Sequence, residues 1–129
     1  MTYSAQEQAN LDLVLAMFRD VLEPLSSAQV DEYIAPGYIQ HSQLAEPGRE
    51  GLKAFLDKVG PNRQQATHDI KRIFADGDHV IVHYHVRRWP DDIGFAVMDI
   101  FRVADGLIQE HWDVMMDVPQ DSPNPNSPF

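Results

Sequence analysis

The first 60 residues carry apolar side chains at helical spacing. One apolar stripe begins behind a Ser4–Glu7 pair with the spacing of a helix-capping box, and Pro24 ends it because proline has no amide hydrogen to donate. A shorter helix is predicted from about residue 27, and a third from about 49 to 59. The apolar positions of these helices are Leu11, Val14, Leu15, Phe18, Leu22, Val30, Tyr33, Ile34, Leu52, Phe55, Leu56 and Val59.

From Thr67 onward the period of the apolar positions falls from about 3.6 to 2, which is typical of strands. Two connections share an Ala-Asp-Gly sequence, at 75–77 and 104–106, which predicts three-residue hairpin loops. Helices followed by a strand meander predict an α+β fold with an antiparallel sheet. The predicted strands cover residues 68–74, 79–89, 95–103 and 107–116, after a brief extended piece at 38–41.

The end of the chain differs in composition from the rest. Residues 119–129 contain four of the nine prolines and no apolar period. We therefore expect a single domain over residues 1–118 and a proline-rich tail over 119–129, extended on the surface or against a partner.

Hairpin geometry determines which side chains of the last two predicted strands share a face. A three-residue loop at 104–106 places Asp99 opposite His111. The same register places Val97 opposite Asp113, so two carboxylates and an imidazole share a face with apolar residues. An apolar pocket raises the pKa of a carboxyl group, as a general base near neutral pH requires. A hydrogen-bonded structural Asp, or a solvated face, would show the same spacing.

Composition and charge narrow the function classes. The chain has 129 residues, 43% of them hydrophobic, which predicts one domain, and its lack of cysteine excludes disulfides, zinc fingers, iron–sulfur clusters and thiol catalysis. The net charge of −10 repels phosphate backbones and anionic membranes, so we expect no nucleic-acid or membrane partner. The first residues lack the features of a signal peptide, and no apolar run reaches about 18 residues, so the expected location is the cytoplasm.

Four short motifs carry a resemblance to a known family. They are Tyr-Ile-Gln-His at 38–41, Gly-Arg-Glu-Gly at 48–51, Val-His-Tyr-His at 82–85 and Glu-His-Trp-Asp-Val at 110–114. In this order and spacing the chain resembles the SnoaL-like polyketide cyclases, and among them the branch described as predicted aldol-condensation enzymes. The resemblance implies a nuclear-transport-factor-2-like cone of three N-terminal helices on a strongly curved antiparallel sheet, with a pocket in its mouth. It also implies a homodimer through the convex sheet face, and neither a metal nor an organic cofactor.

The resemblance also implies a reaction. In the family's cyclases, the acid that aligns with Asp113 removes a proton from the carbon next to a carbonyl and starts an aldol ring closure. Asp113 is therefore the expected general base, and a small hydrophobic carbonyl compound the expected substrate. The cyclases carry a His where this chain has Asp99, and the Gln that follows their Trp-Asp-Val motif is replaced here by Met115-Met116.

The other pocket residues are expected from the resemblance, from strand alternation and from their place in the apolar core. His41 is expected at its mouth, where His41 and Asp99 would position or protonate the substrate oxygen. The alternation places Trp112 away from Asp113 and toward the dimer interface, unless a kink turns its ring into the pocket. The substrate-binding wall is expected to comprise Phe18, Tyr38, Phe55, Tyr84, Phe101, His111 and Trp112.

Other interpretations of these residues stay open. His83 and His85 lie opposite Tyr84, which places them on the convex face unless the turn after their strand changes the parity. This His-x-His pair, together with Asp99 and His111, could bind zinc or iron, but alternating strand residues supply only two ligands per strand and we expect no metal. The cone could also hold a hydrophobic metabolite without catalysis, since one fold serves many functions. Epoxide hydrolysis would need an arginine between two acids, and Arg102 alternates away from Asp99.

Overall fold

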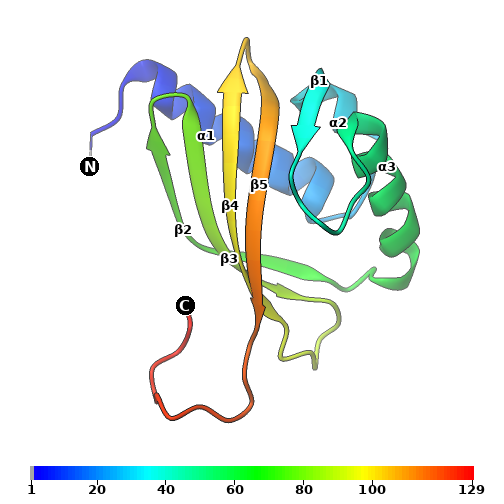
Figure 1. Cartoon of the computed structure of the whole chain (residues 1–129), viewed down its shortest axis with the longest axis vertical. Coiled ribbons are helices and arrows are strands. Elements are labelled where there is room, and N and C mark those ends of the chain that lie inside the picture. Colours follow the sequence, from blue (N-terminus) through cyan, green and yellow to red (C-terminus); the bar gives the residue numbers. More distant parts are fainter. Residues whose placement is uncertain (1) are drawn as a thin grey trace.

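The computed structural model describes residues 2–129 of the chain (Figure 1). The predicted capping box is present, because Ser4 Oγ accepts from the Glu7 amide at 3.1 Å and Glu7 Oε1 accepts from the Ser4 amide at 2.9 Å. In chain order the elements are α1 (Ala5–Met17), the π-helical turn η1 (Phe18–Leu22), α2 (Val30–Tyr33), β1 (Ile34–Gln40), α3 (Gly48–Val59), the 3₁₀ turn η2 (Gly60–Asn62), β2 (Thr67–Asp76), β3 (His79–Arg87), β4 (Phe95–Ala104) and β5 (Leu107–Asp117).

The segment between the first and third helices differs from the prediction. The second helix is a single turn, and Ile34, expected on its inward face, is the first residue of β1. Pro36 and Gly37 lie inside β1. This strand is at the edge of the sheet, where the missing amide hydrogen of proline is tolerated.

One mixed sheet forms the body of the fold, with strand order β1-β5-β4-β3-β2. β1 runs parallel to β5, whereas the other neighbouring strands are antiparallel, so the predicted meander gains a parallel edge strand. Figure 1 shows the sheet curving around α1, with α2 and α3 beside β1. Three helices packed on a curved sheet confirm the predicted α+β fold class.

Both hairpin loops are shorter than predicted. Ala104 pairs with Leu107 across a two-residue turn at Asp105-Gly106. Both turn residues have positive φ, 56° and 72°, which is the type I′ geometry that an Asp-Gly turn favours. Asp76 pairs with His79 in the same way, so this loop also has two residues and not three.

An extra residue interrupts the pairing of β5 with β4. Val103 pairs with Ile108, but Arg102 pairs with Glu110, so Gln109 has no partner and forms a β-bulge. The Gln109 side chain donates to the Ala104 carbonyl at 2.8 Å. The bulge follows the turn directly and determines which β5 side chains face the inside of the cone.

The hydrophobic core lies between α1 and the inner face of the sheet. Leu15, predicted in the buried helix stripe, is 40% exposed, because the buried side of α1 and η1 continues through Met17 and Val21. No described helix has the length and apolar character needed to cross a membrane. Fully buried core residues include Val14, Val21, Val30, Leu56, Val80, Val82 and Ile108.

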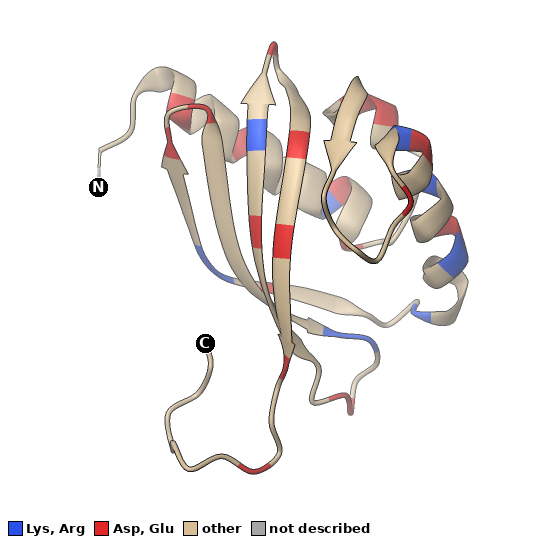
Figure 2. Ribbon diagram, in the orientation of Figure 1, with Lys and Arg blue, Asp and Glu red and all other residues tan. Residues whose placement is uncertain are grey.

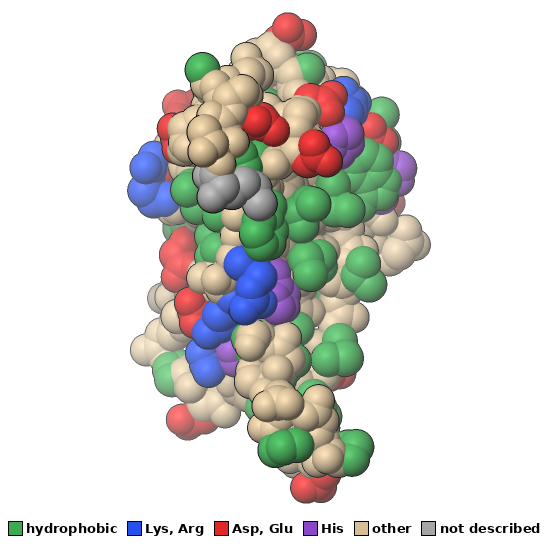
Figure 3. All heavy atoms as spheres, turned by 90° about the vertical axis from the view of Figure 1, so that its left-hand side faces the viewer, with side chains coloured by type: hydrophobic (Ala, Val, Ile, Leu, Met, Phe, Trp, Pro, Cys, Tyr) green, Lys and Arg blue, Asp and Glu red, His purple; other side chains and the backbone are tan. Residues whose placement is uncertain are grey.

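The segment after β5 returns across the outer face of the sheet without forming a helix or strand (Figure 1). The ring of Phe129 stacks on His85, with 4.3 Å between ring centroids, and on His83 at 5.7 Å. Both histidines therefore lie on the convex side, opposite the buried Tyr84, and the tail covers them. Figure 3 shows this side of the molecule, where Lys and Arg side chains gather next to histidine.

Candidate active site

A cavity opens between the helices and the inner face of the sheet. The space between its walls, with the open mouth included, is about 840 Å³. Its wall is mostly apolar, with contributions from Leu52, Phe55, Val97 and Phe101. The strands add the polar side chains of Tyr38, Gln40, Tyr84, Asp99, His111 and Asp113.

The β4–β5 register brings the two acids together. Asp99 is the direct partner of Asp113, so both side chains are on the inner face, and Figure 2 shows acidic residues side by side on these strands. The predicted register, which paired Asp99 with His111, is wrong by two positions. An even shift keeps the same face, so His111 and Asp113 still point inward. Without the bulge at Gln109 the shift would be odd, and Asp113 would point outward.

Asp99 and His111 form a buried pair. The Asp99 side chain is 2% exposed and the His111 side chain 11% exposed, and His111 Nε2 lies 2.9 Å from Asp99 Oδ1. An unpaired carboxylate at this depth would be costly, and the imidazole provides the compensating hydrogen bond.

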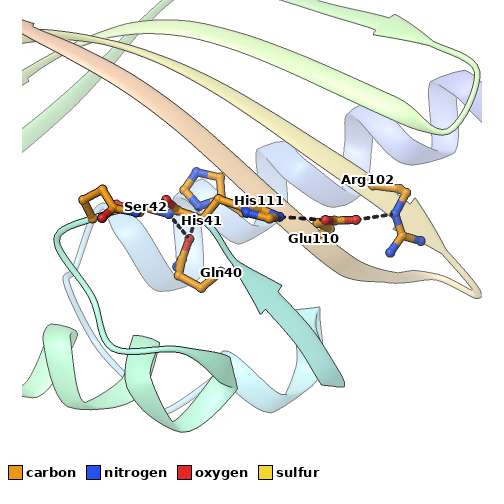
Figure 4. A network of polar contacts seen from close by, with 7 residues as sticks. Gln40, His41, Ser42, Arg102, Glu110 and His111 are labelled. Carbon is orange, nitrogen blue, oxygen red and sulfur yellow. Dashed lines mark hydrogen bonds and ion pairs between the residues drawn. The ribbon is translucent and has the colours of Figure 1, made fainter.

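Gln40 determines which nitrogen of His111 carries a proton. The Ser42 backbone amide donates to Gln40 Oε1 at 3.1 Å, so this oxygen is fixed as an acceptor. The same oxygen lies 2.7 Å from His111 Nδ1, which must therefore carry a hydrogen and donate it (Figure 4). The Nε2–Asp99 contact then contains one further proton, held either as imidazolium–carboxylate or as imidazole–carboxylic acid.

The charges around the pair shift several pKa values. Burial lowers the pKa of His111, but the charge of Asp99, its hydrogen bond and the charge of Asp113 outweigh burial and raise this pKa above its ordinary value. Burial raises the pKa of Tyr84 and of Tyr38, and the negative charge of Asp99 adds to both shifts. Both phenols therefore keep their protons at neutral pH.

Asp113 differs from Asp99 in having no partner. Its half-buried side chain faces the cavity and makes no hydrogen bond or ion pair within residues 2–129. A ligand that enters the cavity can therefore reach a free carboxylate beside a protonated pair.

Comparison with known proteins identifies the family. The SnoaL-like domain matches residues 6–111, which include β1 to β4 and the first part of β5 and end two residues before Asp113. The chain belongs to the SnoaL-like family. A search of curated proteins finds no match.

Solved structures share the fold of this SnoaL-like chain. A candidate polyketide cyclase from Acidithiobacillus ferrooxidans superimposes with a TM-score of 0.71 at 18% identity, covering 89% of this chain and 91% of that one. A candidate SnoaL-like polyketide cyclase from Jannaschia sp. gives 0.71 at 22% identity, with 89% and 90% covered. A nuclear-transport-factor-2-like protein of unknown function from Mesorhizobium loti gives 0.70 at 18% identity, with 89% and 97% covered. These likenesses show the nuclear-transport-factor-2-like fold.

Most of the predicted wall of the SnoaL-like cavity lies where it was expected. Tyr38, Phe55, Tyr84, Phe101 and His111 all line the cavity. Phe18 does not, because its ring is buried behind the wall, where its edge meets Tyr84 at 5.0 Å between ring centroids. Phe18 therefore supports the wall without reaching a ligand.

His41 and Trp112 lie on the outer face, contrary to the expectation that they contribute to the pocket. His41 Nε2 lies 2.7 Å from Glu110 Oε2 (Figure 4). The ring of His41 is stacked on that of Trp112, with 5.0 Å between ring centroids. Both partners occupy the β5 positions that alternate away from His111. Trp112 thus follows the alternation, and the bulge does not turn its ring inward. The strand residue Gln40, next to His41, points to the cavity instead.

Sequence reasoning missed four polar residues of the cavity wall: Gln40, Ser42, Arg63 and His68. Gln40 and Ser42 were detectable in principle, because they alternate with His41 and only one set can face inward. Arg63 lies in the loop after η2 and His68 near the start of β2, and no motif marks either residue.

The geometry of the site also concerns the two alternative chemistries, metal binding and epoxide hydrolysis. Asp99, His111 and Asp113 each offer one ligating atom, all within 4.8 Å of one another, so these three residues could hold a divalent cation. Both nitrogens of His111 already face oxygen partners, and a metal would have to replace the Asp99 contact. Arg102, considered for epoxide hydrolysis, donates to Glu110 at 3.1 Å on the outer face and does not reach the acids.

The raised pKa of His111 predicts how stability depends on pH. A group whose pKa is raised by folding stabilises the fold fully below its unfolded pKa, about 6.5 for histidine, and this contribution is lost as the pH rises through the folded pKa. We expect the free energy of unfolding to fall above pH 6.5 by about 1.4 kcal/mol for each unit of pKa elevation. Asp99→Ala removes the main cause of the elevation and should abolish this decline. Urea unfolding between pH 6 and 9 gives the free energy of unfolding of the wild type and of Asp99→Ala. If this free energy falls with pH as steeply in the variant as in the wild type, the His111–Asp99 pair is not the cause of the decline.

Proposed function

We propose that the SnoaL-like cavity binds a small hydrophobic carbonyl compound and that Asp113 removes a proton from the carbon next to the carbonyl. The observation that carries this proposal is the Asp113 side chain without a partner. It lies on the inner face of an apolar cavity, directly opposite Asp99 of the Asp99–His111 pair. A general base must be free to take a proton, and the group that assists it must be able to supply one.

The proposed reaction needs only groups that line the cavity. Asp113 accepts the proton, the C–H electron pair forms a carbon–carbon double bond, and the carbonyl π electrons move onto oxygen. The phenol of Tyr84 and the proton shared by His111 and Asp99 lie on the same wall and would stabilise the oxygen. The enolate carbon then attacks a second carbonyl of the same molecule, or is protonated at another position. The first outcome is an aldol cyclisation and the second an isomerisation.

Exchange of hydrogen for deuterium tests the proton abstraction without a known substrate. 1-Tetralone is an apolar aromatic ketone with hydrogens next to its carbonyl, and each abstraction in D₂O followed by return of a deuteron is visible by NMR. We expect the wild-type protein to accelerate this exchange above the rate in buffer. A ketone that binds and is returned without exchange would instead favour the non-catalytic alternative, a binding protein for a hydrophobic metabolite.

We also propose that two copies associate through the outer face of β4 and β5. Apolar side chains are exposed there, among them Met98, Val114 and Met116, and Val114 is 73% exposed. Such a patch on a soluble fold is typical of an interaction surface. Sedimentation analysis of the wild type and of Val114→Lys gives the oligomeric state and tests this face.

Residues 1–118 are proposed as the domain and residues 119–129 as its tail. The last strand ends at Asp117, and no residue of the tail lines the cavity. On this basis the tail contributes to the outer face and not to the proposed reaction.

A further inference from the structure

The cavity contains a cationic side chain that the proposed reaction does not use. Arg63 is the one Lys or Arg among residues 2–129 that lines it. Its guanidinium makes no hydrogen bond or ion pair with the described residues, although the chain has twenty acidic side chains against ten basic ones. Most of the other arginines are paired, for example Arg49 with Asp31 and Arg88 with Asp92. A half-buried guanidinium in an acidic protein usually has an anionic partner.

His68 lies in the wall near Arg63, and Glu23 is the acid nearest to its ring. The His68 side chain is 8% exposed, and Nδ1 is buried without a hydrogen bond in the described part of the chain. The nearest acid, Glu23, approaches Nδ1 to 3.3 Å but is aligned with the backbone, where it accepts from the His68 amide at 2.9 Å. His68 therefore adds a buried polar ring to this end of the wall, with Glu23 on its Nδ1 side.

Tyr84 lies between His68 and the acids of the cavity. The ring of His68 is 6.1 Å from that of Tyr84 between centroids, and Tyr84 is next to Asp99. Burial lowers the pKa of His68 and the charge of Arg63 lowers it further, whereas Glu23 and Asp99 oppose them; the net effect keeps the ring neutral near pH 7. A neutral imidazole donates one hydrogen bond, and Arg63 supplies a full positive charge.

We propose that Arg63 and His68 form an anion subsite, and that the molecule bound in the cavity carries a carboxylate at this end. The planar guanidinium fits the two oxygens of a carboxylate, and the apolar body of the ligand would extend from there toward Asp113. The positive charge of Arg63 would have to offset the repulsion of the ligand carboxylate by Glu23 and Asp99, whose charges also act on His68. This inference rests on the proposed function, and it narrows the substrate class to keto acids of hydrophobic character.

Two probes of the same shape but different charge test the subsite. 2-Naphthoate carries a carboxylate and 2-naphthamide a neutral amide, and titration calorimetry gives the affinity of each. We expect the wild type to prefer naphthoate by about tenfold or more, as is typical of a hydrogen bond to a charged group. Arg63→Gln should bring the two affinities to within about twofold by weakening naphthoate alone. Retained binding of naphthamide shows that the variant is folded.

Arg87→Gln is the matched control. Arg87 lies at the end of β3 and borders the groove under the tail, not the cavity, and it has no ion pair among residues 2–129. The preference for naphthoate should survive this change. Equal binding of both probes by the wild type, or an unchanged preference in Arg63→Gln, overturns the subsite and leaves the proposed reaction standing. Failure of both probes to bind overturns the subsite together with the cavity's proposed role.

Discussion

Asp113→Asn should reduce deuterium exchange into 1-tetralone by at least about 100-fold, the lower end of what a positioned general base contributes. The amide has the shape of the carboxylate but cannot accept a proton at neutral pH. Because Asp113 has no hydrogen-bond partner among the described residues, its replacement breaks no pair in the fold. The midpoint of thermal unfolding should therefore remain close to that of the wild type, while the NMR exchange rate falls.

Glu110→Gln is the control for this experiment. Glu110 lies on the same strand as Asp113 but on the outer face, where it pairs with His41 and Arg102. Its replacement removes one acid from the protein without changing the cavity, so the exchange rate should be unaffected. If both variants lost activity equally, or if Asp113→Asn kept its rate, Asp113 could not be the base.

Deletion of Gln109 should abolish the cavity. The bulge is the reason that His111 and Asp113 face inward, and removing one residue moves the rest of β5 to the opposite face. Trp112 and Val114 would then be directed into the cone, and the buried Asp99 would lose its imidazole partner. Breaking a buried charged pair alone costs about 3–5 kcal/mol. Urea unfolding should therefore show a loss of at least this size, and the variant should not bind 1-tetralone.

Gln109→Ala distinguishes the effect of the bulge from the effect of the Gln109 side chain. This variant keeps the number of residues in β5 and loses only the hydrogen bond to the Ala104 carbonyl, which contributes about 1 kcal/mol. We expect it to be slightly less stable and to retain exchange activity. A deletion variant that behaved like Gln109→Ala would show that the bulge does not set the faces of the strand.

The inner face could be predicted from the sequence, although the hairpin itself could not. Strand alternation places Asp99 and Asp113 together under any register shift of even size. The predicted three-residue loop and the observed two-residue turn with a bulge at Gln109 differ by such a shift. Nothing in the local pattern marks Gln109 as unpaired, because a bulge depends on twist and on contacts with the neighbouring strand.

The sequence failed to place His41, Arg63 and His68 correctly for a different reason. His41 was chosen for its chemistry, but β1 pairs in parallel with β5, and this register directs Gln40 toward His111. A parallel edge strand is specified by packing against distant residues, which short motifs do not reveal. Arg63 and His68 escaped notice for a similar reason, since a loop and a strand far from the acids in sequence meet them only in the folded cone.

Under the proposed function a ligand enters the cavity lined by Asp99 and Asp113 and does not bind on the outer face. The chain's six histidines divide between these places and can report on both. Titration of 1-tetralone into protein with ¹⁵N-labelled histidine should shift the ring signals of His68 and His111, which line the cavity, and leave those of the outer-face histidines unchanged. If the ring signals of His41 and His79 shift and that of His111 does not, the ligand binds on the convex surface. This result would contradict binding in the cavity.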